Sequence, residues 1–109
     1  MGTFGVEIGG DMAFGSVHRF PGGTKDQYEA ALARVHPSDG SLLPEGQTYH
    51  AAGATDDGWI VIALWDSRES WERFRDETLM PGLQALGDAG FPSPPQETTF
   101  AIHREQQGS

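Results

Sequence analysis

The sequence predicts an α+β domain of the ferredoxin-like βαββαβ kind, with a four-stranded antiparallel sheet. Apolar and polar residues alternate in four short segments, which is typical of strands, and two other segments repeat at helical spacing. A length of 109 residues supports one domain with one core. With right-handed crossovers, the strands take the order 4-1-3-2 and both helices lie on one face of the sheet.

The first half of the chain predicts a strand followed by a helix. Residues 13–20 alternate as a half-buried strand does. Thr24 precedes Gln27 by three residues, which is the spacing of a capping box at a helix start. Apolar residues then recur at helical intervals until His36 and Pro37, and the proline ends the helix.

A hairpin follows a loop over residues 37–46, which is rich in turn-forming residues. Residues 47–53 and 59–65 predict its two strands, on either side of the segment Thr55-Asp56-Asp57-Gly58. We expect Gly58 to adopt the left-handed conformation that a tight connection favours.

The second helix begins after Ser67, whose side chain can cap its first turn. Trp71 and Phe74 share one face of this helix. Pro81 lies in the first turn of a further segment, residues 80–86, which predicts either a short separate helix or a kink in a longer one.

The ends of the chain flank this predicted domain. A last alternating segment, residues 98–103, predicts the fourth strand. We expect residues 1–11 to form a flexible, glycine-rich arm, residues 12–104 to form the domain, and residues 105–109 to form a frayed tail.

Composition narrows the classes of function. The net charge is −9, from 16 acidic and 7 basic residues, which argues against nucleic acid or an anionic membrane as partner. The chain has no cysteine, so it offers no disulfide and no thiolate, and a cytoplasmic location fits best. The first residues have neither the basic start of a secretory signal nor a continuous apolar run.

The third strand predicts self-association, because residues 59–65 carry no polar side chain on either face. Two helices can cover only one face of a four-stranded sheet. We assign one row to the helix side: Ile60, Ile62 and Leu64. The other row would face a second copy around a shared apolar pocket: Trp59, Val61, Ala63 and Trp65. In the alternative, a monomer folds its N-terminal arm and loops over this row.

The junction between the third strand and the second helix carries a family resemblance. Residues 64–71, Leu-Trp-Asp-Ser-Arg-Glu-Ser-Trp, with Phe74 beyond them, resemble the W-x-S-x-x-x-aromatic junction of the dimeric α/β-barrel superfamily, particularly its antibiotic biosynthesis monooxygenase-like domains. The order of elements over residues 12–104 extends the similarity. The resemblance implies a homodimer in which two sheets form one barrel.

Members of this superfamily include cofactor-independent oxygenases, polyketide cyclases and haem-degrading enzymes. In quinone-forming oxygenases an Asn lies four residues before the junction Trp, where this chain has Val61. Haem-degrading relatives use a histidine of the second helix, whereas residues 68–90 contain none, so we expect no haem and no other cofactor. Trp65 and Trp71 carry over as pocket walls, or alternatively as plain core aromatics.

The function that the resemblance implies is a cofactor-independent monooxygenase-like or cyclase-like enzyme. Its substrate would be a hydrophobic aromatic or polyketide-type small molecule, held in an apolar pocket between sheet and helices. The alternative is a non-catalytic homodimer that binds such a ligand. A third reading is a structural dimer whose interface is fully packed.

His50 is the candidate acid–base residue, since a neutral imidazole can accept a proton near pH 7. A two-residue turn pairs it with Ala63 and a three-residue turn pairs it with Leu64, and one residue of shift reverses its face. We favour the pocket side. His36, at a helix end, is set aside as structural.

The other candidate ligand-binding residues combine the apolar row with nearby polar and aromatic side chains. The candidate substrate-binding residues are Trp59, Val61, Ala63, Trp65, Trp71, His18, His103, Tyr49 and Phe14. We predict no metal site, because strands one and two are separated by strand three and no carboxylate completes a compact cluster.

Overall fold

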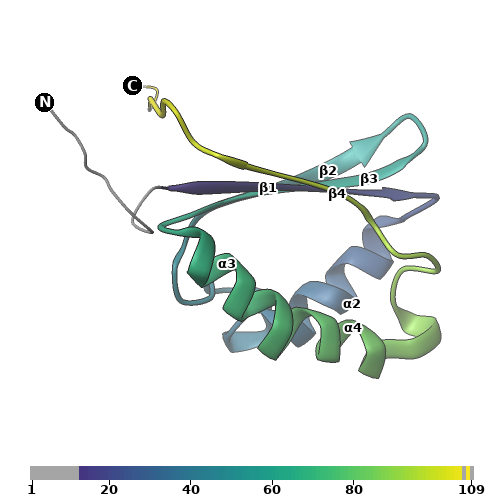
Figure 1. Ribbon diagram of the computed structural model, residues 1–109. Helices are drawn as coiled ribbons and strands as arrows, with labels where there is room; N and C mark the ends of the chain where they lie inside the picture. Colours follow the sequence, from purple (N-terminus) through teal and green to yellow (C-terminus); the bar gives the residue numbers. More distant parts are fainter. Residues whose placement is uncertain (1–12, 107, 109) are drawn as a thin grey trace, which may run out of the picture.

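The computed structural model describes residues 13–106 and 108, and it has one sheet layer covered on one face by helices (Figure 1). The strands are β1 (Phe14–Pro21), β2 (Gln47–Thr55), β3 (Gly58–Trp65) and β4 (Gln96–Ala101). The helices are α2 (Lys25–Val35), α3 (Arg68–Phe74) and α4 (Met80–Leu86). A π-helical turn, Arg75–Leu79, joins α3 to α4, and short 3₁₀ turns lie at Ser38–Gly40 and Gly87–Ala89.

The four strands form one antiparallel sheet in the order β2-β3-β1-β4, which confirms the predicted topology. The last strand begins and ends two residues earlier than predicted, because β4 follows β1 only as far as the pair Phe14 and Ala101. The predicted arm, residues 1–11, lies outside the described residues, and the domain limits remain a prediction.

The start of α2 has the predicted capping box. The side chain of Thr24 accepts a hydrogen bond from the backbone N–H of Gln27 at 3.2 Å, and Gln27 Oε1 accepts one from the backbone N–H of Thr24 at 3.0 Å. These two bonds satisfy N–H groups that the first turn of a helix leaves unpaired. Helix α2 ends at Val35, just before His36 and Pro37.

The hairpin between β2 and β3 closes through a two-residue turn, since Thr55 pairs with Gly58. The prediction that Gly58 takes a left-handed conformation is wrong, because it is absent from the positive-φ glycines of the described chain. Glycine is instead required by close packing: a Cβ atom there would collide with the backbone oxygen of Phe20. A bulge between Gln47 and Tyr49 shifts the register near the start of β2.

Helices α3 and α4 form one nearly continuous rod with a wide turn in its middle. Pro81 has no N–H to donate, and its ring crowds the carbonyl four residues earlier, so a regular α-helical turn is disfavoured there. The backbone N–H of Met80 donates to the carbonyl of Arg75, a spacing of five residues. Each predicted alternative is correct in part, because α4 is a distinct helix and the π-helical turn joins it to α3 without a break.

The assignment of the two rows of β3 to the two sheet faces is wrong. The row with the tryptophans faces the helices, where Trp65 contacts Trp71 and Phe74 of α3 with ring centroids 5.7 and 5.2 Å apart. Ile62 lies on the opposite face and is 36% exposed. Both rows are apolar, so hydrophobicity alone does not distinguish them. The larger side chains of the tryptophan row fill the space under the helices, where α3 contributes the aromatic rings of Trp71 and Phe74.

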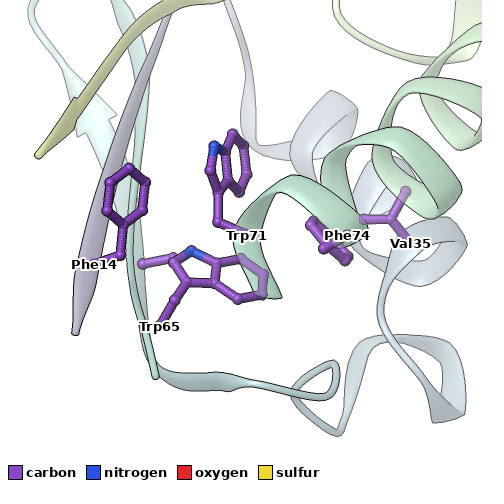
Figure 2. Packing of buried hydrophobic residues seen from close by; sticks show 6 residues of the cluster. Phe14, Val35, Trp65, Trp71 and Phe74 are labelled. Atoms are coloured by element: carbon purple, nitrogen blue, oxygen red, sulfur yellow. The ribbon is translucent and has the colours of Figure 1, made fainter. Parts of the chain in front are cut away.

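The core lies between the sheet and the helices (Figure 2). It joins Trp65 of β3 to Trp71 and Phe74 of α3, with Val35 of α2 and Phe14 of β1 at its sides. The largest fully buried side chain is that of Trp65, 1% exposed. Several core side chains, among them Trp65, Trp71 and Phe74, also line a cavity in this space.

Candidate functional site

A cavity of about 70 Å³ lies between the sheet and the helices. One ordered water needs about 10–15 Å³ on the same measure, so the space holds several waters or one small ring. The lining is mostly apolar, with a few polar side chains. The polar residues in it are Ser16, His18, Tyr28, His36, Gln47 and His50. Such a lining is typical of small-molecule sites, where a few polar groups orient a ligand.

The strongest polar arrangement in the cavity is a chain of three side chains around His50. Gln47 Oε1 lies 3.0 Å from His50 Nδ1, and because an amide oxygen can only accept, Nδ1 carries the proton. The neutral ring then presents a lone pair at Nε2, to which the Tyr28 hydroxyl donates at 2.6 Å. Gln47 and His50 come from β2, and Tyr28 comes from α2.

The local structure explains how these side chains meet. The two-residue turn pairs His50 with Ala63, so both residues face the cavity. This face lies under the helices, whereas the pocket side favoured from the sequence was the sheet face turned away from them. The bulge after Gln47 puts this side chain on that same face, three residues before His50. Thr48, which lies between Gln47 and Tyr49, is exposed.

Burial keeps the side chains of His50 and Tyr28 uncharged near neutral pH. It lowers the pKa of His50, because water no longer solvates the imidazolium. It also raises the pKa of Tyr28, with a smaller contribution from the negative charge of Glu29. A neutral imidazole beside a protonated phenol can accept one proton and pass on another, which is the requirement for acid–base work.

His36 adds a second imidazole next to His50, with ring centroids 4.8 Å apart in an edge-on arrangement. Burial and, to a smaller extent, the neighbouring His50 lower the pKa of His36 to about 4. The sequence predicts a structural role for His36 at a helix end. The structure places it in the cavity wall, 7% exposed.

The opposite wall, on β1, carries a second polar group. His18 is 7% exposed, and its Nε2 lies 3.0 Å from a carboxylate oxygen of Glu97 on β4. Two residues earlier, the buried Ser16 hydroxyl accepts a hydrogen bond from Trp65 Nε1 at 3.1 Å. This bond fixes the indole plane of Trp65 at the cavity wall.

The structure brings most of the predicted site residues to this cavity. Those in its lining are His18, His50, Val61, Ala63, Trp65 and Trp71. Phe14 and Trp59 lie on the same sheet face outside the lining: Phe14 packs in the core, and Trp59 contacts Tyr28 with ring centroids 5.3 Å apart. The indole N–H of Trp59 is buried with no partner among the described residues.

Two predicted site residues lie away from the cavity. Tyr49 is 52% exposed on the uncovered sheet face, because strand residues alternate and its neighbour His50 faces inward. His103 is exposed and follows the end of β4, which is two residues earlier than predicted. Neither residue can line this cavity.

Four polar residues that contact the site residues are not indicated by the sequence: Ser16, Tyr28, Gln47 and Glu97. Tyr28 lies in the predicted first helix, at one of the apolar intervals that are typical of packing residues, and no pattern predicts the bulge that turns Gln47 inward. Among residues 13–106, no three acidic, histidine or cysteine side chains are grouped to hold a metal ion. In the same range, no helix combines the length and apolarity needed to cross a membrane.

The protein resembles known proteins in its structure and not in its sequence. No protein-family model and no curated protein matches the sequence. A candidate antibiotic biosynthesis monooxygenase from Chloroflexus aurantiacus is 13% identical, with a TM-score of 0.61 over 87% of this chain and 97% of that chain. SnoaB of Streptomyces nogalater, a cofactor-independent oxygenase solved as a mutant, is 18% identical, with a TM-score of 0.53 over 87% of this chain and 96% of that chain.

A third solved structure shares the same architecture. It is a monooxygenase from the gene ActVA-Orf6 of Streptomyces coelicolor, in complex with nanaomycin D. It is 15% identical, with a TM-score of 0.53 over 90% of this chain and 93% of that chain. At these identities the likeness establishes the fold and leaves the activity open. The resemblance inferred at the Trp65 junction is confirmed at this level: the chain has the fold of the antibiotic biosynthesis monooxygenase-like proteins.

Proposed function

We propose that the protein is a cofactor-independent enzyme of the monooxygenase-like or cyclase-like kind, acting on a small aromatic molecule. The observation that carries this proposal is a neutral, doubly hydrogen-bonded histidine, His50, in the wall of an apolar cavity. The similar structures named as oxygenases support the general kind of chemistry. The volume of the cavity favours a substrate with one ring over a fused polyketide.

The proposed reaction begins with removal of a proton from an acidic C–H or O–H of the bound molecule. The substrate proton passes to the Tyr28 oxygen while the Tyr28 hydroxyl proton passes to His50 Nε2, 2.6 Å away. The products are an enolate or phenolate and an imidazolium whose Nδ1–H still donates to Gln47. The anion then attacks another carbon of the same molecule or reacts with dioxygen.

The walls of the cavity contribute by excluding water and orienting the ring. Trp65 is held by Ser16, and Trp71 packs against it, so both present fixed aromatic surfaces. A planar substrate gains from such contacts beyond the area that it buries, by about 0.5–1.5 kcal/mol for each aromatic pair. A dry site also strengthens each hydrogen bond made inside it.

We further propose that a second copy of the chain covers the sheet face opposite the helices. This face carries large apolar side chains that are at least partly exposed: Tyr49, Ile60, Ile62, Leu64 and Phe100. A contiguous apolar patch of this kind is typical of an interface between subunits. The homodimer predicted from the sequence would thus use the isoleucine row, while the tryptophan row serves the cavity.

A non-catalytic ligand-binding role is the second candidate, and one residue favours it. Val61 lies in the cavity wall at the position where quinone-forming oxygenases have an Asn. Valine has no group that could polarise a substrate oxygen. In this case the Tyr28–His50–Gln47 chain would only bind the polar end of a ligand.

The test compares ligand binding with turnover on one panel of phenols, naphthols and hydroxyquinones. Binding is followed by quenching of tryptophan fluorescence, and turnover by product formation with and without dioxygen. Ala63→Leu fills the cavity and should abolish both signals, whereas Ala85→Leu, on the exposed face of α4, should leave them unchanged. Binding that survives Ala63→Leu would place the ligand elsewhere and contradict the proposal.

A second pair of variants separates the enzyme from the binding protein. His50→Ala should reduce turnover at least about 100-fold while a ligand still binds, since a positioned acid–base group contributes about that much. His103→Ala removes an exposed histidine and is the matched control. Unchanged turnover in His50→Ala shows that the acid–base role is wrong, and absence of turnover in the wild type with every bound ligand favours the non-catalytic candidate.

A further inference from the structure

A second proton-transfer group lies on the wall of the cavity opposite His50. His18 is in β1 and His50 is in β2, with β3 between them. Neighbouring strands are about 4.8 Å apart, so the two backbones are separated by about 10 Å. Both histidines line the same cavity, and one ring-sized molecule between them can contact both.

Glu97 fixes the orientation and the tautomer of His18. A glutamate carboxylate accepts hydrogen bonds, so the contact of 3.0 Å to Nε2 places the ring proton on Nε2. Nδ1 then carries a lone pair, and the described residues make no hydrogen bond to it. Register supports the pairing, because His18 lies directly opposite Glu97 in the β1–β4 ladder. A base held by a carboxylate is the usual arrangement of an activated histidine.

The other side of this pair is open to solvent. The Glu97 side chain is 43% exposed, whereas the His18 side chain is 8% exposed. The contact therefore connects the interior of the cavity with bulk water at the edge strand β4. The His50 group differs, because both of its ring nitrogens have partners within the protein.

We propose that His18 and Glu97 form a second acid–base pair that takes the proton of a phenolic hydroxyl at the β1 wall of the cavity. This inference rests on the proposed function, since it requires an aromatic ligand in the cavity. His18 contacts the ligand and is the catalytic residue, whereas Glu97 is a positioning residue. The substrate class becomes narrower: a one-ring aromatic with hydrogen-bonding groups at two opposite ends, one for Tyr28 and one for His18.

The proton balance of the step is simple. The phenolic O–H bond breaks, its proton binds to His18 Nδ1, and the electron pair stays on the phenolate oxygen. The imidazolium keeps its Nε2–H bonded to Glu97. After the phenolate leaves, Nδ1 releases its proton to water, so that His18 returns to its neutral Nε2–H form and the ligand has lost one proton to solvent.

Other charged and titratable groups near this pair are few. On the cavity side they are Tyr28, His36 and His50, which line the same cavity. Helix α3 packs the uncharged Trp71 against His18, with ring centroids 5.2 Å apart. Arg75, paired with Asp76, lies close enough to Glu97 to interact through its charge.

The experiment uses 4-nitrophenol, a one-ring phenol whose phenolate absorbs at longer wavelength than the neutral form. The pH is varied while the protein is present at a concentration that saturates the probe. The phenolate fraction of the bound probe is measured at each pH. We expect the wild type to ionise the bound probe at lower pH than Glu97→Gln does. At a fixed pH, the phenolate to phenol ratio should fall about 10-fold or more in that variant, because an imidazolium loses its paired charge.

Matched variants and a second method complete the test. Glu105→Gln removes one exposed carboxylate elsewhere and should leave the ratio unchanged, while His18→Gln should lower it at least as much as Glu97→Gln. A ratio that Glu97→Gln leaves unchanged, with the probe still bound, overturns this inference and leaves the proposed function standing. A probe that fails to bind contradicts both.

A measurement on the free protein tests the pair without any ligand. Nitrogen-15 NMR of the imidazole distinguishes the two neutral tautomers. We expect His18 to carry its proton on Nε2 in the wild type, and the preference to weaken in Glu97→Gln, since an amide can also donate. A proton found on Nδ1 in the wild type overturns the inference.

Discussion

The buried imidazole of His36 makes the stability of the protein fall in mild acid. Burial, and to a smaller extent His50, lower its pKa from 6.5 to about 4. As the pH falls below 6.5, this histidine takes up a proton in the unfolded chain, whereas in the folded protein it stays neutral until the pH approaches 4. The free energy of unfolding therefore decreases through this window, because the unfolded state binds more protons.

The size of the effect follows from the same values. Each pKa unit corresponds to about 1.4 kcal/mol, so a fall from 6.5 to about 4 corresponds to at most about 3.5 kcal/mol. Water in the cavity and small movements of the neighbouring rings reduce this limit, and we expect about 2 kcal/mol. That is a large share of the stability of a domain of this size, which is typically about 5–15 kcal/mol.

The variant His36→Phe removes the titrating group and keeps an aromatic ring among His50 and Phe74. Urea unfolding, followed by tryptophan fluorescence, gives the free energy of unfolding between about pH 7.5 and pH 4.5. We expect the loss of stability over this range to be about 2 kcal/mol smaller in His36→Phe than in the wild type. His103→Phe, on the surface, is the control and should follow the wild type.

The result that would refute this reasoning is an equally steep loss of stability in His36→Phe. A part of the loss should persist, because burial also lowers the pKa of His50, and this part should disappear in the double variant with His50→Phe. If the single variant behaves like the wild type, His36 is solvated in the folded protein and the cavity wall at the end of α2 is open.

Three further predictions test the capping box, the buried Ser16 and the uncovered sheet face. Thr24→Ala should lower the free energy of unfolding by about 1 kcal/mol, measured by urea unfolding, whereas Thr24→Ser should restore most of it. Ser16→Ala leaves the indole N–H of Trp65 unpaired and should cost about 1–3 kcal/mol, together with a change in the fluorescence of Trp65. Ile62→Asp places a charge on the uncovered face and should convert the proposed dimer to a folded monomer, as judged by light scattering with size-exclusion chromatography; a wild type that is already monomeric contradicts the dimer.

The sequence predicts the fold well because several independent signals agree. The capping box of Thr24 and Gln27, the turn at Asp56-Asp57 and the Ser67 cap each fix one boundary locally. Only a few topologies place such elements with right-handed crossovers in one sheet. Local chemistry and long-range order thus specify the same sheet.

The face of the sheet on which each row lies could not be predicted in this way. Both rows of β3 are apolar, so the hydrophobic pattern has no preference for either register relative to the helices. The decision depends on partners far apart in sequence: Ser16 accepts from Trp65 across 49 residues, and Trp71 contacts His18 across the helix–sheet space. Such contacts leave no periodic trace in a single sequence.

The same limitation explains why the sequence indicates His50 as a candidate site residue and does not indicate its hydrogen-bond partners. A histidine is a candidate by its chemistry alone, because its charge changes near neutral pH. Tyr28, Gln47 and Glu97 become functional candidates only through distance: 2.6, 3.0 and 3.0 Å from a histidine nitrogen. The consequence is a sharper chemical hypothesis than any histidine allows by itself, since the partners determine which nitrogen donates and which accepts. At His50 both nitrogens have partners, whereas at His18 one nitrogen remains for a ligand, so the two walls of the cavity should differ in the polar group that each binds.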